Sequence, residues 1–344
     1  MPPLGTKDDD CRLSEVASLE DCFLAEETEV IDSMNKEAEK TGYKYNGHIV
    51  WKVVAMMSIL HVAGIYGAVI GATSAMYKTW IYVIIVAHYA TLSITAGSHR
   101  LWTHKAYKAN YGVRMLWMIG STIAAQGHVI WWSRQHRCHH KWTDSDADPH
   151  NSKRGWFFSH MGWLMVKRHP KTLEMGAKID LSDLEADELL VFQSTYLWPF
   201  ALFLYYVISF IPWYFWDEEL IVSFFFVGAF RLMVQYNMTW TINSVAHLWG
   251  YHKPFDKEAS ACDNLWHSSI SNGEAWHNFH HAFPQDYRAS EFAWKANLTG
   301  MIIDFFAWNG WVWDRKIMCQ EAVERQKEKF GDHSRQILEF VKAN

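Results

Sequence analysis

Residues 53–77, VVAMMSILHVAGIYGAVIGATSAMY, run for 25 positions without a charged side chain. An α-helix needs ~20 predominantly apolar residues to cross the hydrocarbon core of a bilayer. A second uncharged run of 21 residues follows directly, between Lys78 and Arg100. Two such runs separated by one lysine predict a hairpin of two membrane-spanning helices, near residues 50–72 and 79–98.

Two further apolar runs lie in the second half of the chain. The 28 residues before Asp217 carry no charge, and residues 220–248 carry one, Arg231. These runs predict spans near 194–215 and 219–240, and Arg231 must then face protein rather than lipid. The alternative is a set of buried core helices, which would need a soluble shell large enough to cover all four.

The distribution of positive charge predicts the orientation of these spans. Lysines and arginines gather at the open ends of the first hairpin, whereas its loop holds Lys78 alone and the loop 216–219 holds none. By the positive-inside rule, both termini and residues 99–193 and 241–320 are cytosolic.

The rest of the chain divides into two tails and one interrupted helix. Residues 1–48 carry 12 acidic and 5 basic side chains and predict a disordered cytosolic tail. Residues 321–344 form a charged cytosolic tail, which leaves 49–320 as the single domain. The uncharged run 115–133, interrupted at residues 126–128, predicts an amphipathic helix at the membrane interface.

The predicted fold class is therefore an all-α membrane protein. It has four transmembrane helices in two hairpins, an interfacial amphipathic helix and a cytosolic helical cap. A net charge of −5 argues against nucleic acid as a partner. Five widely spaced cysteines without a C-x-x-C pair exclude a disulfide scaffold.

The 19 histidines form three notable clusters, HRLWTH at 99–104, HRCHH at 136–140 and HNFHH at 277–281. At ~100° per residue, the three imidazoles of H-x2-H-H project from one face within a single helical turn. The two histidines of H-x4-H fall ~140° apart on an ideal α-helix. They therefore either serve different metals or lie where the helix ends.

The residue types limit the choice of metal. Structural zinc sites are rich in cysteine, and hydrolytic zinc sites use H-E-x-x-H, which neither H-x2-H-H cluster has. Ferritin-type sites use two E-x-x-H motifs, and this chain has one, Glu274–His277. A shell made only of imidazole suits iron or copper, and the number of histidines implies two metals.

Longer stretches around these clusters carry a family resemblance. ITAGSHRLWTHKAYKA, WSRQHRCHHKWTDSDADPHNSKRGWFFSHMGW, NSVAHLWG and NGEAWHNFHHAFPQDYR resemble the membrane-bound fatty acyl-CoA desaturases of the stearoyl-CoA desaturase group, over roughly residues 45–320. The resemblance implies a di-iron centre with two Fe²⁺ ions, and Asn243 contacting one of them through water. The histidine ligands that it implies are His99, His104, His136, His139, His140, His247, His277, His280 and His281.

The same resemblance implies a reaction and its partners. A double bond is introduced into a long-chain saturated fatty acyl-CoA with consumption of O₂. Electrons come from cytochrome b5, which NADH–cytochrome b5 reductase reduces, at the endoplasmic reticulum membrane. No haem-binding H-P-G-G motif occurs in the chain, so the expected donor is a separate protein.

The family encloses its acyl chain in a bent tunnel, and the resemblance assigns residues to that tunnel. Trp132 could alternatively be an interfacial anchor, and residues 167–168 could contact lipid headgroups. The matching positions are Gln126, Trp132 and Thr239 at the bend, Arg134, Lys167 and Arg168 at the CoA phosphates, and Ala87 and Thr91 near the closed end.

Departures from the family pattern leave alternatives open. Gln135 and Gly127 replace the Asp and Asn of mammalian members, and Ala87 stands where stearoyl-type enzymes carry Tyr. The chain length and double-bond position are therefore not predicted, and a non-Δ9 desaturase, such as a Δ11 enzyme, remains an alternative. A hydroxylase or acetylenase could use the same site. A non-catalytic metal carrier would instead line its spans with histidine.

Overall fold

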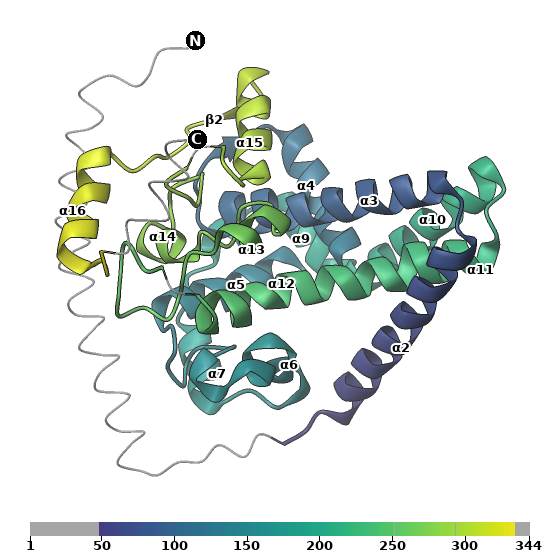
Figure 1. Ribbon diagram of the computed structural model, residues 1–344, viewed down its shortest axis with the longest axis horizontal. Coiled ribbons are helices and arrows are strands. Elements are labelled where there is room, and N and C mark those ends of the chain that lie inside the picture. Colours follow the sequence, from purple (N-terminus) through teal and green to yellow (C-terminus); the bar gives the residue numbers. More distant parts are fainter. Residues whose placement is uncertain (1–47, 251, 293, 334–344) are drawn as a thin grey trace.

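The computed structural model describes residues 48–333, except 251 and 293 (Figure 1). The predicted N-terminal tail therefore lies outside the described residues, apart from its last position, as does the end of the predicted C-terminal tail. The described chain is built almost entirely of helices, in agreement with the predicted all-α class.

Four helices of the described chain are long and apolar enough to cross a membrane, as predicted. Connections of two residues, 75–76, and three residues, 217–219, pair them into two hairpins. The spans are Trp51–Ser74 (α2), Tyr77–Thr103 (α3, Tyr77–Leu92, continued by the π-helix η1, Ser93–Thr103), Leu197–Trp216 (α10) and Leu220–Leu248 (α11, Leu220–Val222, the π-helix η4, Ser223–Phe230, and α12, Arg231–Leu248).

The second and fourth spans run further than their hydropathy predicts, to Thr103 and Leu248 rather than to 98 and 240. Half of the most apolar window of each is buried inside the protein, against 17% for the other two spans. Packing against the cap therefore extends these two helices beyond the apolar stretch. As a result, His99 and His247 lie on the last turns of continuous spans.

Most of the segments between and after the spans form the cap at one end of the bundle, whereas residues 111–124 pack along the second span (Figure 1). Two short antiparallel strands pair Lys108 with Trp313. The remaining elements are α4 (Tyr111–Ala124), α5 (Val129–Lys141), η2 (Ser152–Arg154), η3 (Phe158–Gly162), α6 (Trp163–Met165), α7 (Pro170–Ala177), α8 (Ser182–Glu185), α9 (Glu188–Thr195), α13 (Leu265–Ile270), α14 (His277–Ala282), α15 (Leu298–Trp308), α16 (Gln320–Phe330), β1 (Lys108–Ala109) and β2 (Val312–Trp313).

The predicted amphipathic segment 115–133 is divided between α4 and α5. Ala125 adopts a left-handed conformation (φ 56°) and Gly127 has φ 89°, so the chain turns at the interruption noted in the sequence. A Cβ atom on Gly127 would lie 3.0 Å from the Trp131 ring, which explains why glycine occupies this position. The turn allows α5 to present the HRCHH cluster separately from α4.

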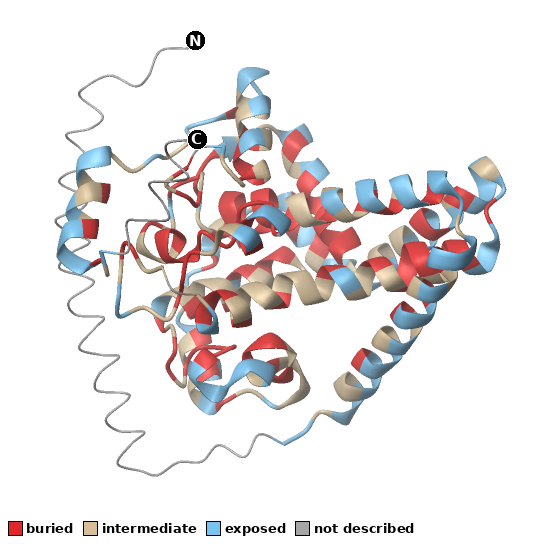
Figure 2. Cartoon of the chain, in the orientation of Figure 1, coloured by how far each residue is buried: buried red, intermediate tan, exposed pale blue. Residues whose placement is uncertain are grey.

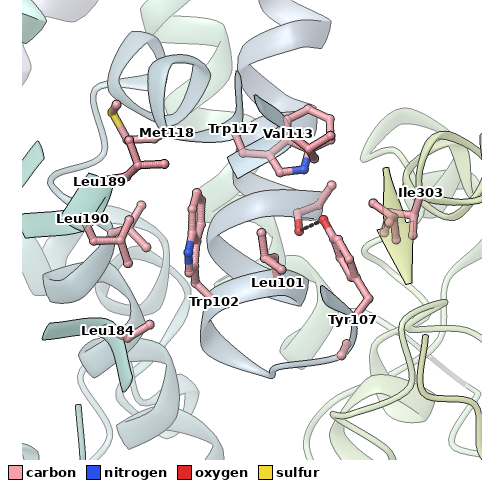
Figure 3. Packing of buried hydrophobic residues seen from close by; sticks show 14 of the residues in the cluster. Leu101, Trp102, Tyr107, Val113, Trp117, Met118, Leu184, Leu189, Leu190 and Ile303 are labelled. Carbon is pink, nitrogen blue, oxygen red and sulfur yellow. Dashed lines mark hydrogen bonds between the residues drawn. The ribbon is translucent and has the colours of Figure 1, made fainter. Parts of the chain in front are cut away.

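The largest hydrophobic cluster lies where α4, α9 and α15 pack around η1 (Figure 3). Trp102 packs between the leucines of α8 and α9 and the rest of the cluster, and Trp117 lies against Gly97 of η1. The hydroxyl of Tyr107 donates to the carbonyl of Ala96 (2.8 Å). This packing fixes the end of the second span, from which the first histidine cluster projects.

Arg231 is buried in protein, as predicted for a charge within a span. Its guanidinium donates to the carbonyls of Val227 (3.1 Å) and Ile123 (3.3 Å) and to the side-chain oxygen of Gln235 (3.2 Å). The partners that the sequence could not identify are thus two backbone carbonyls and a neutral amide, which tie the fourth span to α4.

Candidate metal centre

Five of the predicted histidines converge at the ends of the spans that the charge distribution assigns to the cytosol. Within this first group, one ring nitrogen of each residue lies within 4.8 Å of the others. Three separate segments supply them: η1 and the residue after it, α5, and α14. The members of the first group are His99, His104, His136, His140 and His280.

The π-helical end of the second span explains why H-x4-H works here. The amide of His104 donates to the carbonyl of His99 (3.1 Å), a bond that spans five residues rather than four. This wider turn brings the two rings together, with centroids 4.9 Å apart. An ideal α-helix would separate these two rings, whereas the structure places both in one group where the second span ends, in agreement with the second of the two alternatives.

The other four predicted histidines form a second group, in which one ring nitrogen of each residue again lies within 4.8 Å of the others. α5 contributes to both groups, because His136 and His140 belong to the first and His139 to the second. The fourth span provides His247, and α14 provides the remaining two. The members of the second group are His139, His247, His277 and His281.

Hydrogen-bond partners at Nδ1, two of them buried carboxylates, fix the orientation of three of these rings. Nδ1 of His99 lies 2.7 Å from a carboxylate oxygen of Glu274, and Nδ1 of His139 lies 2.9 Å from Asp148. Nδ1 of His247 lies 2.7 Å from the hydroxyl of Ser260. A partner at Nδ1 fixes the tautomer and leaves the Nε2 lone pair directed into the group, as in metal-bound histidines.

The ring nitrogens that converge in these groups cannot all form hydrogen bonds with one another. Nε2 of His280 lies 2.9 Å from Nε2 of both His99 and His140, although a neutral ring nitrogen is either one donor or one acceptor. Among the described residues, Nε2 of His104 and of His139 is buried without any hydrogen-bond partner. Buried polar atoms are normally paired, so these donor sets fit two cations that would accept the lone pairs.

The protonation state agrees with a ligand role. Burial, followed by the charges of neighbouring histidines, holds the pKa of six of these side chains well below its usual value. The rings are therefore neutral at physiological pH, which metal binding requires. The six are His104, His136, His140, His277, His280 and His281.

Glu274 is the most informative residue that the sequence argument left without a role. Burial alone would raise its pKa, but Arg100 and His99 lower it to about 2. Its other oxygen lies 2.6 Å from the Arg100 guanidinium, which also donates to the carbonyls of Tyr287 and Arg288. The E-x-x-H motif pointed to Glu274 in the sequence. Its carboxylate nevertheless contacts His99 of the first cluster and not His277 of its own motif.

The acidic loop after HRCHH places one carboxylate, that of Asp148, against the second group. Burial would raise the pKa of Asp148, but His139 and His150 keep it below its usual value. Asp144 instead accepts from the Ser152 hydroxyl (2.6 Å). His150 packs on His139 at a centroid distance of 4.3 Å, a contact that the sequence argument missed.

A cavity of about 390 Å³ adjoins both groups, because His99, His136 and His277 line it. Its other walls come mainly from α3, η1 and α12 and from residues that follow α13, and most of the cavity surface is apolar. The volume is in the range of small-molecule sites. Asn243 of the fourth span lines the same cavity, one helical turn before His247 of the second group.

Four of the predicted substrate residues line this cavity: Ala87, Thr91, Trp132 and Thr239. The Trp132 ring stacks on His136, with centroids 5.0 Å apart, so it faces the site. Gln126 lies behind the wall and donates to the hydroxyl of Thr239 (2.7 Å), bridging the α4–α5 turn and the fourth span.

The three predicted CoA-binding cations lie outside the cavity. Arg134 is exposed on α5, and Arg168 lies over the Trp131 ring at 5.4 Å. Arg134 lies one helical turn after Trp131 on α5, and burial together with the positive charge of Arg134 lowers the pKa of Arg168. Lys167, which directly precedes Arg168 in the sequence, is exposed.

Comparisons with known proteins agree with this geometry. A family model described as fatty acid desaturase matches residues 77–296. The chain is 44% identical over 310 residues to the Delta(9)-fatty-acid desaturase fat-6 of Caenorhabditis elegans, covering 90% of this chain and 91% of that protein. It is 43% identical to the stearoyl-CoA desaturase of Bos taurus and 42% identical to that of Homo sapiens, covering 86% of this chain and 82% of each relative.

Proposed function

The chain belongs to the fatty acid desaturase family, and from this premise we propose that it is an O₂-dependent acyl-CoA desaturase acting on a long-chain saturated fatty acyl-CoA. One observation carries the proposal: the apolar cavity passes beside both histidine groups. His99 and His136 of the first group and His277 of the second lie in its wall. An acyl chain in this cavity would therefore lie next to both candidate metal sites.

The two groups would hold two iron ions, five histidines around one and four around the other, with Asn243 near the second through water. When bound, the irons would supply the activation of O₂ needed to remove two hydrogens from neighbouring carbons. An unactivated methylene has no acidic proton, so side-chain acids and bases cannot do this chemistry. The role of the protein is to bind, orient and exclude water.

The cavity walls perform that role. Trp132 and Thr239 shape the wall beside the histidines, and Gln126 holds Thr239 in place. Fixing one carbon–carbon bond beside the reactive centre replaces a random encounter with a defined geometry. Ala87 and Thr91 lie further along the span from His99, which suits the methyl end of the chain.

Arg134, Lys167 and Arg168 would bind the CoA phosphates outside the cavity. Their clustering at the surface beside α5 supports this assignment, since guanidinium groups bind phosphate well. Contact of Lys167 and Arg168 with lipid headgroups is the alternative for the same charges.

Electrons would come from cytochrome b5 and its NADH-dependent reductase. The histidine groups lie at the ends of the spans rather than at mid-depth, which suits a donor that docks on the cap. We place the chain in the endoplasmic reticulum membrane as a multi-pass protein with both termini in the cytosol. The charge distribution of the loops supports this orientation.

Expression in desaturase-deficient yeast tests the activity directly. Gas chromatography with mass spectrometry of the lipids should show monounsaturated chains, and derivatisation should locate the double bond. The control is a His280→Ala variant expressed to the same level. Hydroxylated or acetylenic products would replace the proposal by the corresponding alternative, and no new product together with iron-free purified protein would refute it.

Substitution at Ala87 tests the assignment of the distal wall. A tyrosine there would fill cavity volume at the methyl end. An Ala87→Tyr enzyme should therefore lose activity on the longest acyl-CoA substrates first, in competition assays with a chain-length mixture. Unchanged chain selectivity would contradict this placement of the chain.

A further inference from the structure

Helix α15 carries an outer face of large apolar side chains. Met301, Phe305 and Trp308 are 48%, 49% and 78% exposed, and their spacing places them on one side of the helix. The opposite side belongs to the core: Ile303 is fully buried, and the Phe306 ring lies 5.4 Å from that of Trp117. Figure 2 shows that α15 has buried and exposed residues, and large apolar side chains occur among both.

Almost no charge offsets this exposure. The sequence LTGMIIDFFAW has one ionisable residue, Asp304, which accepts from the hydroxyl of Tyr287 (2.7 Å) and pairs with Arg315. A helix that is hydrophobic all round belongs in a membrane or against a partner. A water-exposed surface of this kind would be costly, so the outer face needs an occupant.

The depth of α15 along the second span indicates what that occupant is. If Lys78 marks one interface, the ~30 Å hydrocarbon core ends ~20 residues later, near residue 98. The Thr299 hydroxyl at the start of α15 lies 2.9 Å from that of Thr95, which precedes this boundary. The N-terminal end of α15 is therefore level with the edge of the hydrocarbon core.

Helix α4 continues the same surface deeper along the span. The Tyr89 hydroxyl donates to the carbonyl of Leu116 (2.7 Å), so this part of α4 lies beside the middle of the second span. Tyr111, Met115 and Leu116 are exposed on its outer side. Val113 and Trp117 of α4 pack in one cluster with Ile303 of α15, so the two helices that carry these exposed apolar residues are neighbours.

We propose that the outer face of α15, formed by Met301, Phe305 and Trp308, docks in the headgroup–acyl boundary of the bilayer leaflet that surrounds the histidine end of the spans. Tryptophan and phenylalanine favour this zone. The run of the helix across the axis of the second span in Figure 1 suits a helix lying along the membrane surface.

This docking bears on the acyl cavity, because Thr299 supports its wall. The Thr299 amide and hydroxyl both donate to the carbonyl of Asn272 (3.1 and 2.8 Å), and the hydroxyl also contacts Thr95. Asn272 and Thr95 both line the cavity. The lipid-contacting helix is thus attached directly to the site that would hold the acyl chain.

Spin labels measure the environment of the outer face. Single cysteines replace Met301, Phe305 or Trp308 in a chain with Cys11, Cys22 and Cys319 changed to serine; Cys138 and Cys262 are buried. In phosphatidylcholine vesicles, labels at the three sites should collide with O₂ several-fold more often than with a water-soluble nickel chelate. Reference labels are at Ile84, on the exposed side of the second span, and at Lys178, an exposed residue directly after α7.

Two results would overturn the proposal. Labels on α15 that prefer the nickel chelate, like the Lys178 reference, would place this face in water. Dipolar broadening that disappears on dilution with unlabelled protein would make a second copy the occupant. Neither result depends on iron or on desaturation.

A second measurement uses the unaltered chain. A phospholipid carrying a diazirine near its headgroup is photolysed in the same vesicles, and the adducts are mapped by peptide mass spectrometry. Adducts should occur within residues 298–308. Adducts on the spans but not on α15 would contradict lipid docking.

Discussion

At the turn end of the bundle, the buried carboxylate of Glu218 is fully engaged. It accepts from the amides of Met76 (2.8 Å) and Glu219 (3.1 Å) and from the Thr79 hydroxyl, and so joins the two hairpins. At the opposite end, nine histidines converge, and in the described chain several of their buried nitrogens lack a partner. Satisfied polar groups stabilise a fold, whereas a concentration of unsatisfied ones marks where a ligand completes the structure.

Removing one converging histidine should have the largest effect. His280→Ala deletes a ring whose Nε2 contacts two others of the first group. We expect purified protein to lose at least one of two irons and the desaturase activity to fall by more than ~100-fold, since even indirect partners of metal ligands contribute 10–100-fold. Iron analysis and acyl-CoA turnover measure this.

The matched control for that variant is His333→Ala, which removes an exposed histidine outside both groups. Its iron content and activity should match those of the unaltered protein. Full iron content in His280→Ala would remove the proposed distinction between the two ends of the bundle.

Removing the carboxylate behind His99 should have the next largest effect. Glu274→Gln leaves His99 without an anionic partner and Arg100 without its buried counter-ion. We expect iron affinity to fall 10–100-fold, measured by competition with a chelator. The free energy of unfolding should also fall by several kcal/mol, because a buried charge loses its partner.

The chain offers a control of the same type, Glu291→Gln, because Glu291 and Lys327 form another nearly buried ion pair away from the histidines. This variant should lose stability without losing iron affinity. Equal loss of affinity in both variants would mean that Glu274 acts through the fold alone and does not orient His99.

Acid should weaken the histidine end selectively. The six histidines with lowered pKa stay neutral in the folded protein, whereas the unfolded chain takes up protons near pH ~6.5. The unfolded state then binds more protons, so the stability of iron-free protein should fall as pH drops below ~6.5, by at most ~1.4 kcal/mol per pH unit for each histidine.

Denaturant unfolding of iron-free protein in detergent, between pH 7.5 and 5, measures this slope. The His280→Ala variant has one titrating ring fewer and should show a shallower slope. Stability that is flat over this range would contradict the neutral state of the buried rings.

The sequence predicted the four spans and singled out histidines that the structure brings together, because both patterns depend on local rules. Uncharged length identifies a span, and the H-x2-H-H spacing places three rings on one helical face. It failed where the backbone departs from ideal geometry, because the α-helical angle for H-x4-H does not apply to the π-helix that contains His99. The break between α4 and α5 at Gly127 likewise follows from the geometry of the turn, although the sequence showed an interruption at residues 126–128.

The sequence could not identify contacts between distant segments. Glu274 and His99 are far apart in the chain, and so are Arg231 and Ile123, yet each pair is in contact. Spacing within a motif carries no information on such pairs, since tertiary packing decides them. The same is true of Thr299 and the cavity wall.

The smallest functional effect is expected at the turn end. Glu218→Gln keeps the shape of the side chain but places an amide donor where the carboxylate accepts hydrogen bonds from Met76 and Thr79. A donor facing a donor should reduce the free energy of unfolding by ~1–3 kcal/mol. Iron content should not change, because the histidine groups lie at the other end of two spans. Thermal unfolding in detergent, with iron analysis of the same sample, measures both, and iron loss would show that the ends are coupled through the bundle.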